Sequence, residues 1–369
     1  MDIYRLMMPC LVLGTRPEII KMAPVIRELG AREIPFRLVH TGQHYSPDLD
    51  GVFFDDLGLP PPDINLGVGS GTHAEETAGI MVGVERALLK GGADITLVLG
   101  DTNSTLGGAL AAAKLHVPLG HIEAGLRSHD RRMPEEINRV LTDHCSDFLF
   151  PPTPNAEHGL LAEGIDAEKM RTTGNTIVDA VEQSIAIARE RSTILEELRL
   201  EPSSYLLATA HRHENVDDRT KLAVIMEGLG RVAARLDLPI VCPLHPRTKN
   251  RLGEFGLSVP QGVMVTEPLG YLDFLHLEAH ARIVLTDSGG IQEEACILGV
   301  PCVTFRDNTE RPETLEVGSN VLAGTDPERM VECARNMLKA AGGWTNPFGD
   351  GKAAGRIVDS LFDGSWLHK

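Results

Sequence analysis

Short apolar runs alternate with amphipathic helical segments along this 369-residue chain, and the alternation occurs in two series. Strand–helix alternation of this kind builds parallel sheets joined by crossover helices. A long polar helical stretch, Ile177–Leu198, separates the two series. We therefore predict an α/β protein with two Rossmann-like domains, residues 1–174 and 175–351. A last helix, within about residues 352–369, can pack back on the first domain.

The apolar runs are expected to form strands, with helices between them. In the first domain the expected strands are Leu6–Leu13, Phe36–Thr41, Ile95–Leu99, Pro118–Ile122, Phe148–Phe150 and Met170–Thr172. In the second they are Tyr205–Ala210, Ile240–Cys242, Val263–Val265, Arg282–Thr286 and Cys302–Phe305. Two such domains facing each other form a central cleft, and ligands bind at the carboxyl ends of parallel strands.

Charge and composition narrow the classes of partner. The formal net charge of −17 argues against nucleic acid and anionic membranes, because both require a basic face. No apolar run approaches the ~20 residues that a membrane span needs. Leu6–Leu13 leads directly into a loop motif, so we do not expect a signal peptide. The six cysteines form no C-x-x-C pair, and we expect reduced thiols and a cytoplasmic protein.

The most specific local pattern lies between Thr286 and Glu294. A buried strand leads into Ser288-Gly289-Gly290, and a helix is expected from Ile291 to Leu298. A helix start offers unpaired N–H groups and a favourable dipole to an anion, and two glycines let a phosphate approach the backbone. Glu294, one turn into the helix, can accept hydrogen bonds from a ribose. The pattern suits a nucleotide diphosphate.

Acidic side chains follow two strands of the first domain and open the next helix. Asp101 can cap the helix after it, although its place at a strand end favours the cleft. Strand alternation puts His121 and Glu123 on one face of their strand. A carboxylate at the end of a buried strand destabilises the fold unless it has a partner or a functional role. Glu135 and Glu136 begin a helix, where acids are ordinary dipole partners. Carboxylates gathered at one cleft can supply a general base.

Basic residues also follow the strands. Arg16 and Lys21 can grip an anion above the first loop, or they can be surface residues beside an ordinary turn. His211-Arg212-His213-Glu214 lacks the helical H-E-x-x-H spacing, so we predict no metal and expect a phosphate contact from His211 or Arg212. His245 is either a structural loop histidine or a ligand contact.

Two further residues have an ordinary and a functional interpretation. Phe274 can stack against a base, or it can belong to the core. Arg311 lies in Thr309–Glu313, which is either a second cluster of arginine and carboxylates near a strand end or a solvated loop.

As a set, these motifs closely resemble one family, the non-hydrolysing UDP-N-acetylglucosamine 2-epimerases. The matching segments keep one order along the chain: Gly14–Ile26, Thr41–His44, Gly100–Thr105, His121–Ser128, Met133–Arg139, Gly174–Asp179, Ala210–Asn215, Asp287–Ala295 and Thr309–Glu313. The resemblance implies a GT-B-like fold, interconversion of UDP-GlcNAc and UDP-ManNAc, and a homodimer.

The resemblance also implies roles for single residues. Those matching catalytic residues of the family are Asp101, Glu123, Glu135 and His211. Those matching contacts to the UDP-sugar are Arg16, Lys21, Phe274, Ser288, Gly289, Gly290, Glu294 and Arg311. Gln43, Arg212 and His245 match part of a pocket that binds a second, activating UDP-GlcNAc in some members. That pocket's basic contact would fall within Gly69–His73, which contains no arginine, so we do not predict activation.

The chemistry implied by the resemblance needs no redox cofactor. UDP leaves C1 as the C2 proton is removed, which gives a 2-acetamidoglucal, and UDP adds back after protonation of the other face. Two faces of one carbon demand at least two proton carriers. Alternatives are a hydrolysing 2-epimerase, a 2-epimerase for a UDP-diacetamido uronic acid, a GT-B glycosyltransferase and a non-catalytic UDP-sugar sensor.

Overall fold

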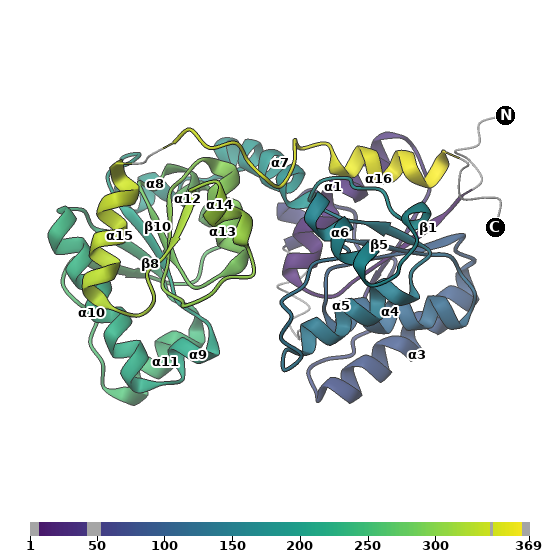
Figure 1. Ribbon diagram of the computed structural model, residues 1–369, viewed down its shortest axis with the longest axis horizontal. Coiled ribbons are helices and arrows are strands. Elements are labelled where there is room, and N and C mark those ends of the chain that lie inside the picture. The colour runs from purple at the N-terminus through teal and green to yellow at the C-terminus, as the bar shows by residue number, and fades with distance from the viewer. Residues whose placement is uncertain (1–6, 43–52, 340–341, 364–369) are drawn as a thin grey trace. The chain divides into compact units, whose positions relative to one another are not determined.

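The computed structural model describes residues 7–42, 53–339 and 342–363. The chain divides into two compact units, Met1–Glu182 with Phe348–Lys369, and Gln183–Pro347. Each unit contains one six-stranded parallel sheet with helices on both faces (Figure 1). The α/β class and the two Rossmann-like sheets predicted from the strand–helix alternation are confirmed.

The first sheet has the strand order β3-β2-β1-β4-β5-β6. Its strands are β1 (Pro9–Leu13), β2 (Arg37–His40), β3 (Ile64–Asn65), β4 (Ile95–Leu99), β5 (Leu119–Ile122) and β6 (Phe148–Phe150). The order reverses between β1 and β4, because β2 and β3 lie on one side of β1 and the later strands on the other. The loops after β1 and β4 therefore flank the switch point at which open α/β sheets bind ligands.

Helices cover both faces of this sheet (Figure 1). On one face lie α1 (Arg16–Ala31) and α16 (Ala353–Phe362), and on the other α3 (His73–Gly91), α4 (Asn103–Lys114) and α5 (Pro134–Cys145). A shorter helix, α6 (Pro154–Ala162), follows β6. Buried Val12 and Val98 pack with Ile80 and Ala109 in the core on the α3–α4 side.

The second sheet repeats this plan with the order β12-β11-β10-β7-β8-β9. Its strands are β7 (Leu206–Thr209), β8 (Ile240–Pro243), β9 (Val263–Thr266), β10 (Val284–Thr286), β11 (Cys302–Thr304) and β12 (Asn320–Leu322). The switch point lies between β7 and β10, so the loops that carry His211 and Ser288 flank it.

The two faces of the second sheet have separate cores. The helices on one face are α10 (Arg219–Leu236), α11 (Pro246–Phe255) and α15 (Pro327–Lys339); those on the other are α8 (Ile194–Glu197), α12 (Tyr271–His280) and α13 (Gly289–Leu298). Leu206 and Ala208 of β7 point to the first core, whereas Tyr205 and Leu207 point to the second, as strand alternation requires. Two short helices, α9 (His213–Val216) and α14 (Pro312–Glu316), follow β7 and β11.

Several details differ from the sequence-based expectations. Helix α13 begins at Gly289, whereas the sequence led us to expect its start at Ile291. Met170–Thr172 is not a strand, since only one parallel bridge joins Met170 to Leu149. The short edge strands β3 and β12 were not predicted, because two or three residues carry no clear periodicity. Helix α11 was also not predicted, although Pro246 occupies its first turn and His245 caps it.

The chain crosses between the units in α7 (Thr176–Arg191) and returns at Phe348. The expected boundary at residue 174 lies just before α7, whereas the units divide within that helix. Asp179 of α7 accepts hydrogen bonds from the N–H groups of Ala353 (3.2 Å) and Ala354 (3.0 Å) at the start of α16. Arg32, the residue directly after α1, pairs with Asp359 of α16 at 2.5 Å. The C-terminal helix is thus fastened to the first unit.

All six cysteines are free, and burial raises the pKa of Cys10 to about 12. Within residues 7–42, 53–339 and 342–363, no helix is both long enough and apolar enough to cross a membrane.

Candidate active site

A buried carboxylate supports the loop after β1. Glu18, in the first turn of α1, accepts hydrogen bonds from the N–H groups of Gly14 (2.9 Å) and Thr15 (2.7 Å). An acid at the third helical position closes a capping box in this way. Arg16 is exposed at the start of α1, with its guanidinium carbon 5.8 Å from the ring centre of Phe53. The loop is therefore fixed while its arginine stays accessible.

The same carboxylate joins this loop to the loop after β4. The hydroxyls of Thr102 (2.6 Å) and Thr105 (3.0 Å) both donate to Glu18. Burial raises the pKa of Glu18, and these hydrogen bonds oppose the rise. Gly14 permits close approach of the segment after β4, because a Cβ there would lie 2.2 Å from the Ser104 hydroxyl oxygen. The two loops at the switch point are thus locked together.

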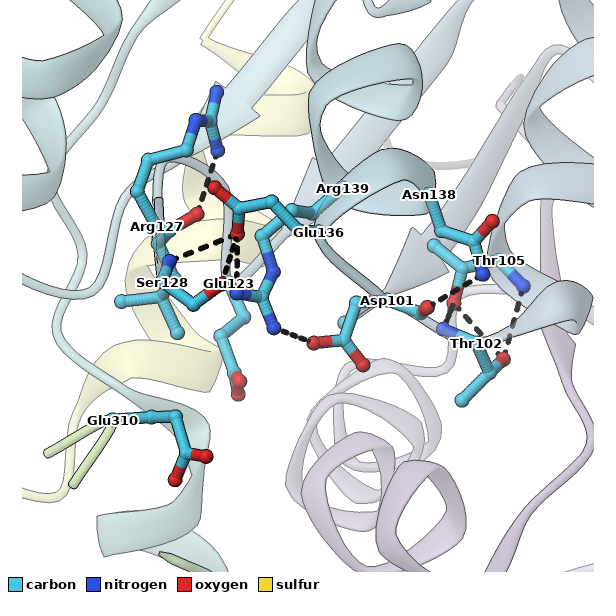
Figure 2. Close-up of polar contacts among 12 residues, drawn as sticks. Asp101, Thr102, Thr105, Glu123, Arg127, Ser128, Glu136, Asn138, Arg139 and Glu310 are labelled. Carbon is cyan, nitrogen blue, oxygen red and sulfur yellow. Dashed lines mark hydrogen bonds and ion pairs between the residues drawn. The ribbon is translucent and has the colours of Figure 1, made fainter. Parts of the chain in front are cut away.

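Asp101 lies at the start of the second of these loops, with its side chain one-third exposed. Its carboxylate forms an ion pair with Arg139 of α5, which also contacts Glu136 at 2.9 Å (Figure 2). Asn138 donates to the Asp101 carbonyl at 2.9 Å. Asp101 does not cap α4, because Thr102 occupies that position and accepts from the helix. Its carboxylate is therefore held at the strand end by α5.

Glu123 follows β5 in a left-handed backbone conformation, with φ of 69°. This conformation is uncommon for a residue with a side chain, and strained residues of this kind cluster at functional sites. The Lys21 ammonium lies 2.5 Å from the Glu123 carboxylate, and both side chains are almost buried. The structure thus brings together a candidate acid and a candidate anion-binding cation from separate motifs.

A buried network supports the turn that carries Glu123. His121 contacts the Asp143 carboxylate through Nδ1 (2.7 Å) and the Gly100 carbonyl through Nε2 (2.8 Å). Asp143 also pairs with Arg127 at 2.7 Å and accepts from the Gly125 N–H at 3.2 Å. Burial opposes ionisation, but His121 and Arg127 hold the pKa of Asp143 below its ordinary value. This network fixes the loops after β4 and β5 relative to each other.

The two acids that open α5 have different surroundings. Glu135 is exposed. Glu136 is buried and accepts hydrogen bonds from the N–H groups of Ser128 (2.8 Å) and His129 (2.9 Å), as Figure 2 shows for Ser128. Burial alone would raise the pKa of Glu136. The hydrogen bonds and the charge of Arg139 outweigh burial, so the pKa lies below its ordinary value. Glu136 therefore orders the loop, while a catalytic role for Glu135 stays a prediction.

In the second unit, Asp287 organises the loop after β7. This fully buried carboxylate lies 3.2 Å from Nδ1 of His211 and accepts from the N–H groups of His211 (3.2 Å) and Arg212 (3.1 Å) and from the Asn215 amide (3.0 Å). Burial opposes ionisation, yet His211 and Asn215 lower the pKa of Asp287. The His211 ring is thus oriented through Nδ1 and remains 41 % exposed.

The turn after β10 leads directly into α13, with Ser288 at the N-cap position and Gly289 as the first helical residue. Neither Gly289 nor Gly290 has a left-handed φ. A Cβ at Gly289 would come no closer than 3.5 Å to any neighbour, and one at Gly290 no closer than 3.9 Å. The fold therefore does not itself require glycine at either position, and contact with a phosphate there stays a prediction.

The remaining ligand candidates of this unit lie on and around α12 and α13. Glu294 is buried, and its carboxylate lies near the Tyr271 hydroxyl. Phe274 is partly buried against the core between these helices and the sheet. Arg311 forms an ion pair with buried Glu293 at 2.6 Å.

The residues expected in a second nucleotide-sugar pocket have partners within the protein. Arg212 pairs with Glu310 at 3.3 Å, and Arg306 pairs with the same carboxylate at 2.9 Å. His245 caps α11 by accepting from Arg247, and burial lowers the pKa of His245. Gln43 lies outside the described residues.

Sequence reasoning missed the buried partners of the candidate residues: Glu18, Arg139, Asp143 and Asp287. The spacing Thr15-x-x-Glu18 is a capping-box signal that could have identified the first. The others act across long sequence distances, which a single chain does not reveal. In the part of the chain that the structure describes, no three His, Cys, Asp or Glu side chains form a set that could hold a metal ion.

Comparisons with known proteins agree with this geometry. The family model described as UDP-N-acetylglucosamine 2-epimerase matches residues 27–362. A UDP-N-acetylglucosamine 2-epimerase of Methanococcus maripaludis is 51 % identical over 95 % of this chain and 97 % of its own. The UDP-2,3-diacetamido-2,3-dideoxy-D-glucuronate 2-epimerase of Pseudomonas aeruginosa is 42 % identical over 95 % of this chain and 98 % of its own.

A solved structure extends the likeness to three dimensions. The crystal structure of Methanocaldococcus jannaschii UDP-GlcNAc 2-epimerase in complex with UDP-GlcNAc and UDP has a TM-score of 0.89 and 49 % identity, and it covers 97 % of this chain and 100 % of its own. Two Rossmann-like units with their polar residues at the switch points define a GT-B-like protein. Within that class, the chain belongs to the UDP-N-acetylglucosamine 2-epimerase family.

Proposed function

We propose that this chain interconverts UDP-GlcNAc and UDP-ManNAc by elimination and re-addition of UDP, without net hydrolysis. The observation that carries the proposal is 51 % identity, over nearly the whole of both chains, to a relative named for 2-epimerisation of UDP-GlcNAc. The candidate residues identified above supply both the anion-binding groups and the acids that such a reaction needs.

The second unit is proposed to bind the nucleotide diphosphate. The first turn of α13 offers backbone N–H groups over two glycines that leave space for a phosphate. As the C1–O bond breaks, negative charge grows on the diphosphate. The exposed His211 ring and these N–H groups then stabilise that charge, and removing one such preorganised donor typically costs about 3 kcal/mol of transition-state stabilisation.

The first unit is proposed to move the proton. Glu123 and Asp101 are held by Lys21 and Arg139 respectively, so each carboxylate is oriented by a cation from another element. One acid takes the proton from C2, the C1–O bond breaks as C1=C2 forms, and another acid returns a proton to the opposite face before UDP attacks C1. Asp101, Glu123 and Glu135 are the candidates, and the base and acid are not assigned among them.

Product analysis tests this function. The purified protein is incubated with UDP-GlcNAc alone, and the nucleotides and free sugars are separated and identified by proton NMR. We expect UDP-ManNAc to accumulate to an equilibrium with UDP-GlcNAc while free UDP stays at trace level. Stoichiometric UDP and ManNAc would instead identify a hydrolysing enzyme, and turnover only with an added acceptor would identify a glycosyltransferase.

A second candidate substrate has specific support. The relative from Pseudomonas aeruginosa acts, by its name, on a 2,3-diacetamido glucuronate nucleotide, and its identity to this chain is 42 %. Parallel assays with both nucleotide sugars separate the candidates. We expect kcat/KM to be higher for UDP-GlcNAc, and a preference for the uronate would replace our first assignment.

The family resemblance also leads us to propose a homodimer. Light scattering should then give about twice the chain mass of 40.0 kDa. A particle of one chain mass at assay concentration would contradict this assembly.

A further inference from the structure

Two buried carboxyl groups lie against each other between α12 and α13. Glu278 of α12 has no exposed surface, and neither of its carboxyl oxygens receives a hydrogen bond from an N–H or O–H donor of the described residues. Its carboxyl group contacts that of Glu294, the residue placed one turn into α13. A hydrogen bond between two carboxyl groups requires that one of them carries a proton.

The neighbours of the pair indicate which carboxyl group holds that proton. Tyr271 and Glu278 are seven residues apart on α12, which places them on one helix face. The Tyr271 hydroxyl lies near both Glu294 and Ser184. Glu278 has no exposed surface, whereas Glu294 is 7 % exposed. Since the more deeply buried carboxyl group loses more by ionising, the shared proton belongs to Glu278.

We propose that Glu278 is a neutral positioning residue, whose carboxyl proton is donated to Glu294 and fixes the Glu294 carboxylate for the ribose hydroxyls of a nucleotide. The inference rests on the proposed function only through the role of Glu294 as the ribose acceptor. A carboxylate that accepts one internal hydrogen bond keeps lone pairs for a ligand but loses much of its freedom to rotate.

The electrostatics of the site agree with this assignment. Burial, followed by the charge of Glu294, raises the pKa of Glu278 well above its ordinary value. Among the residues that the structure describes, the titratable groups that face Glu278 are Glu294, Tyr271 and the Cys302 thiol, and none of these three brings a positive charge. Two adjacent carboxylates without a cation share a proton rather than ionise together.

The test compares Glu278→Gln with Glu278→Leu. A glutamine amide still donates to Glu294, whereas leucine does not. Calorimetry measures the dissociation constants for UDP and for 2′,3′-dideoxy-UDP, and their ratio isolates the ribose contact. We expect wild type and Glu278→Gln to prefer UDP by at least tenfold, and Glu278→Leu to lose most of that preference while dideoxy-UDP binding changes little. A merely structural role would weaken both ligands alike.

Thermal unfolding supplies an independent readout. A raised pKa in the folded state means that Glu278 keeps its proton when the unfolded chain loses it, so its contribution to stability falls as pH rises above about 4.3. Between pH 5 and 7, the Tm of wild type should therefore decline relative to that of Glu278→Gln. An unchanged Tm difference over this range would show that the group is ionised and would overturn the proposal.

The binding outcomes separate this inference from the proposed function. A ribose preference that survives in Glu278→Leu, or that is lost equally in Glu278→Gln, overturns the positioning role. The positioning role is also overturned if the wild-type protein epimerises UDP-GlcNAc but binds UDP and its dideoxy analogue equally well. That result leaves the proposed function intact. If Glu278→Gln keeps the preference for UDP that Glu278→Leu loses, but the wild-type protein has no epimerase activity, the positioning role is supported and the proposed function is contradicted.

Discussion

Glu123 has the most demanding surroundings of the candidate acids. It adopts a left-handed backbone conformation and is almost buried, and its carboxylate pairs with Lys21. A non-glycine residue in that conformation costs about 1 to 2 kcal/mol, so the surrounding structure must stabilise it. The buried network of His121 and Asp143 does so, by fixing the neighbouring turn and the loop after β4.

Glu123→Gln should abolish turnover and leave UDP affinity nearly unchanged. The amide keeps the size of the side chain but cannot accept a proton from C2, and general acid–base groups contribute about 10² to 10⁴-fold. Steady-state kinetics and UDP titration measure the two effects. Glu157→Gln, the same change at a surface glutamate of α6, is the matched control. A variant within twofold of wild-type kcat would remove Glu123 from the catalytic set.

The ion pairs of Glu310 predict how the stability of the protein depends on pH. Although burial opposes it, Arg306 and Arg212 lower the pKa of Glu310 to about 2. A depressed pKa in the folded state contributes stability that is present above the unfolded value of about 4.3 and is lost as pH falls toward 2. Glu310→Gln should therefore be less stable than wild type at pH 6, by about 2 to 3 kcal/mol, and the gap should close below pH 4.

Thermal unfolding at several pH values measures that gap. Glu313→Gln is a control of opposite sign, because burial raises the pKa of Glu313 and its contribution falls as pH rises. A gap between wild type and Glu310→Gln that stays constant from pH 6 to pH 3 would contradict the ion-pair account.

At the level of elements, the sequence predicted most of the fold because its strands are buried. The strands β1, β4 and β10 are fully buried, so each is a mostly apolar segment in the sequence. Such segments are easily recognised as strands when they lie between amphipathic helical segments. The failures have a physical pattern. The strands β3 and β12 are too short to show a period, and α11 is so polar that its cap and proline were the only signals.

The site was predictable where a local motif carries it. Ser288-Gly289-Gly290 leads from a strand into a helix as expected, although α13 already begins at Gly289, and Asp101 lies at its strand end. Alternation failed at Glu123, because the residue has already left the strand and turned. The partners Arg139 and Asp143 come from α5, and no rule of local spacing connects them to Asp101 or His121.

The start of α13 supplies a prediction in which stability and binding change in opposite directions. Gly289→Ala should raise stability by about 0.4 to 1 kcal/mol, because the φ is ordinary and the added methyl group meets no atom closer than 3.5 Å. It should weaken UDP binding at least tenfold, because the methyl group occupies the space proposed for a phosphate.

Gly253→Ala is the matched control for that substitution. Gly253 lies within α11, and a Cβ there meets nothing within 4 Å. This variant should gain similar stability without changing the dissociation constant for UDP. If Gly289→Ala binds UDP as tightly as Gly253→Ala does, the diphosphate is held elsewhere.

In the whole molecule, the chain leaves the first unit through α7 and returns to it at Phe348. The Asn175 N–H donates to the Phe348 carbonyl at 2.8 Å, and Asp179 holds the start of α16. Two segments distant in sequence thus close the first unit around α1, while the second unit is a single continuous insertion between them.

Asp179→Ala should loosen this closure in one unit only. Loss of a helix-capping carboxylate costs about 1 kcal/mol. Amide hydrogen exchange should accelerate in α16 and α1, and the strands of the second sheet should keep wild-type protection. Faster exchange in β7 and β10 would show that the two units do not unfold separately.

Solvent isotope incorporation tests the central proposal most directly, namely that the chain epimerises UDP-GlcNAc by removing the C2 proton and returning a proton to the opposite face. The protein is incubated with UDP-GlcNAc in D₂O, and the C2 position of both nucleotide sugars is followed by proton NMR. We predict UDP-ManNAc that carries deuterium at C2, and no such product from Glu123→Gln. UDP-ManNAc that forms with its original C2 hydrogen would contradict the account.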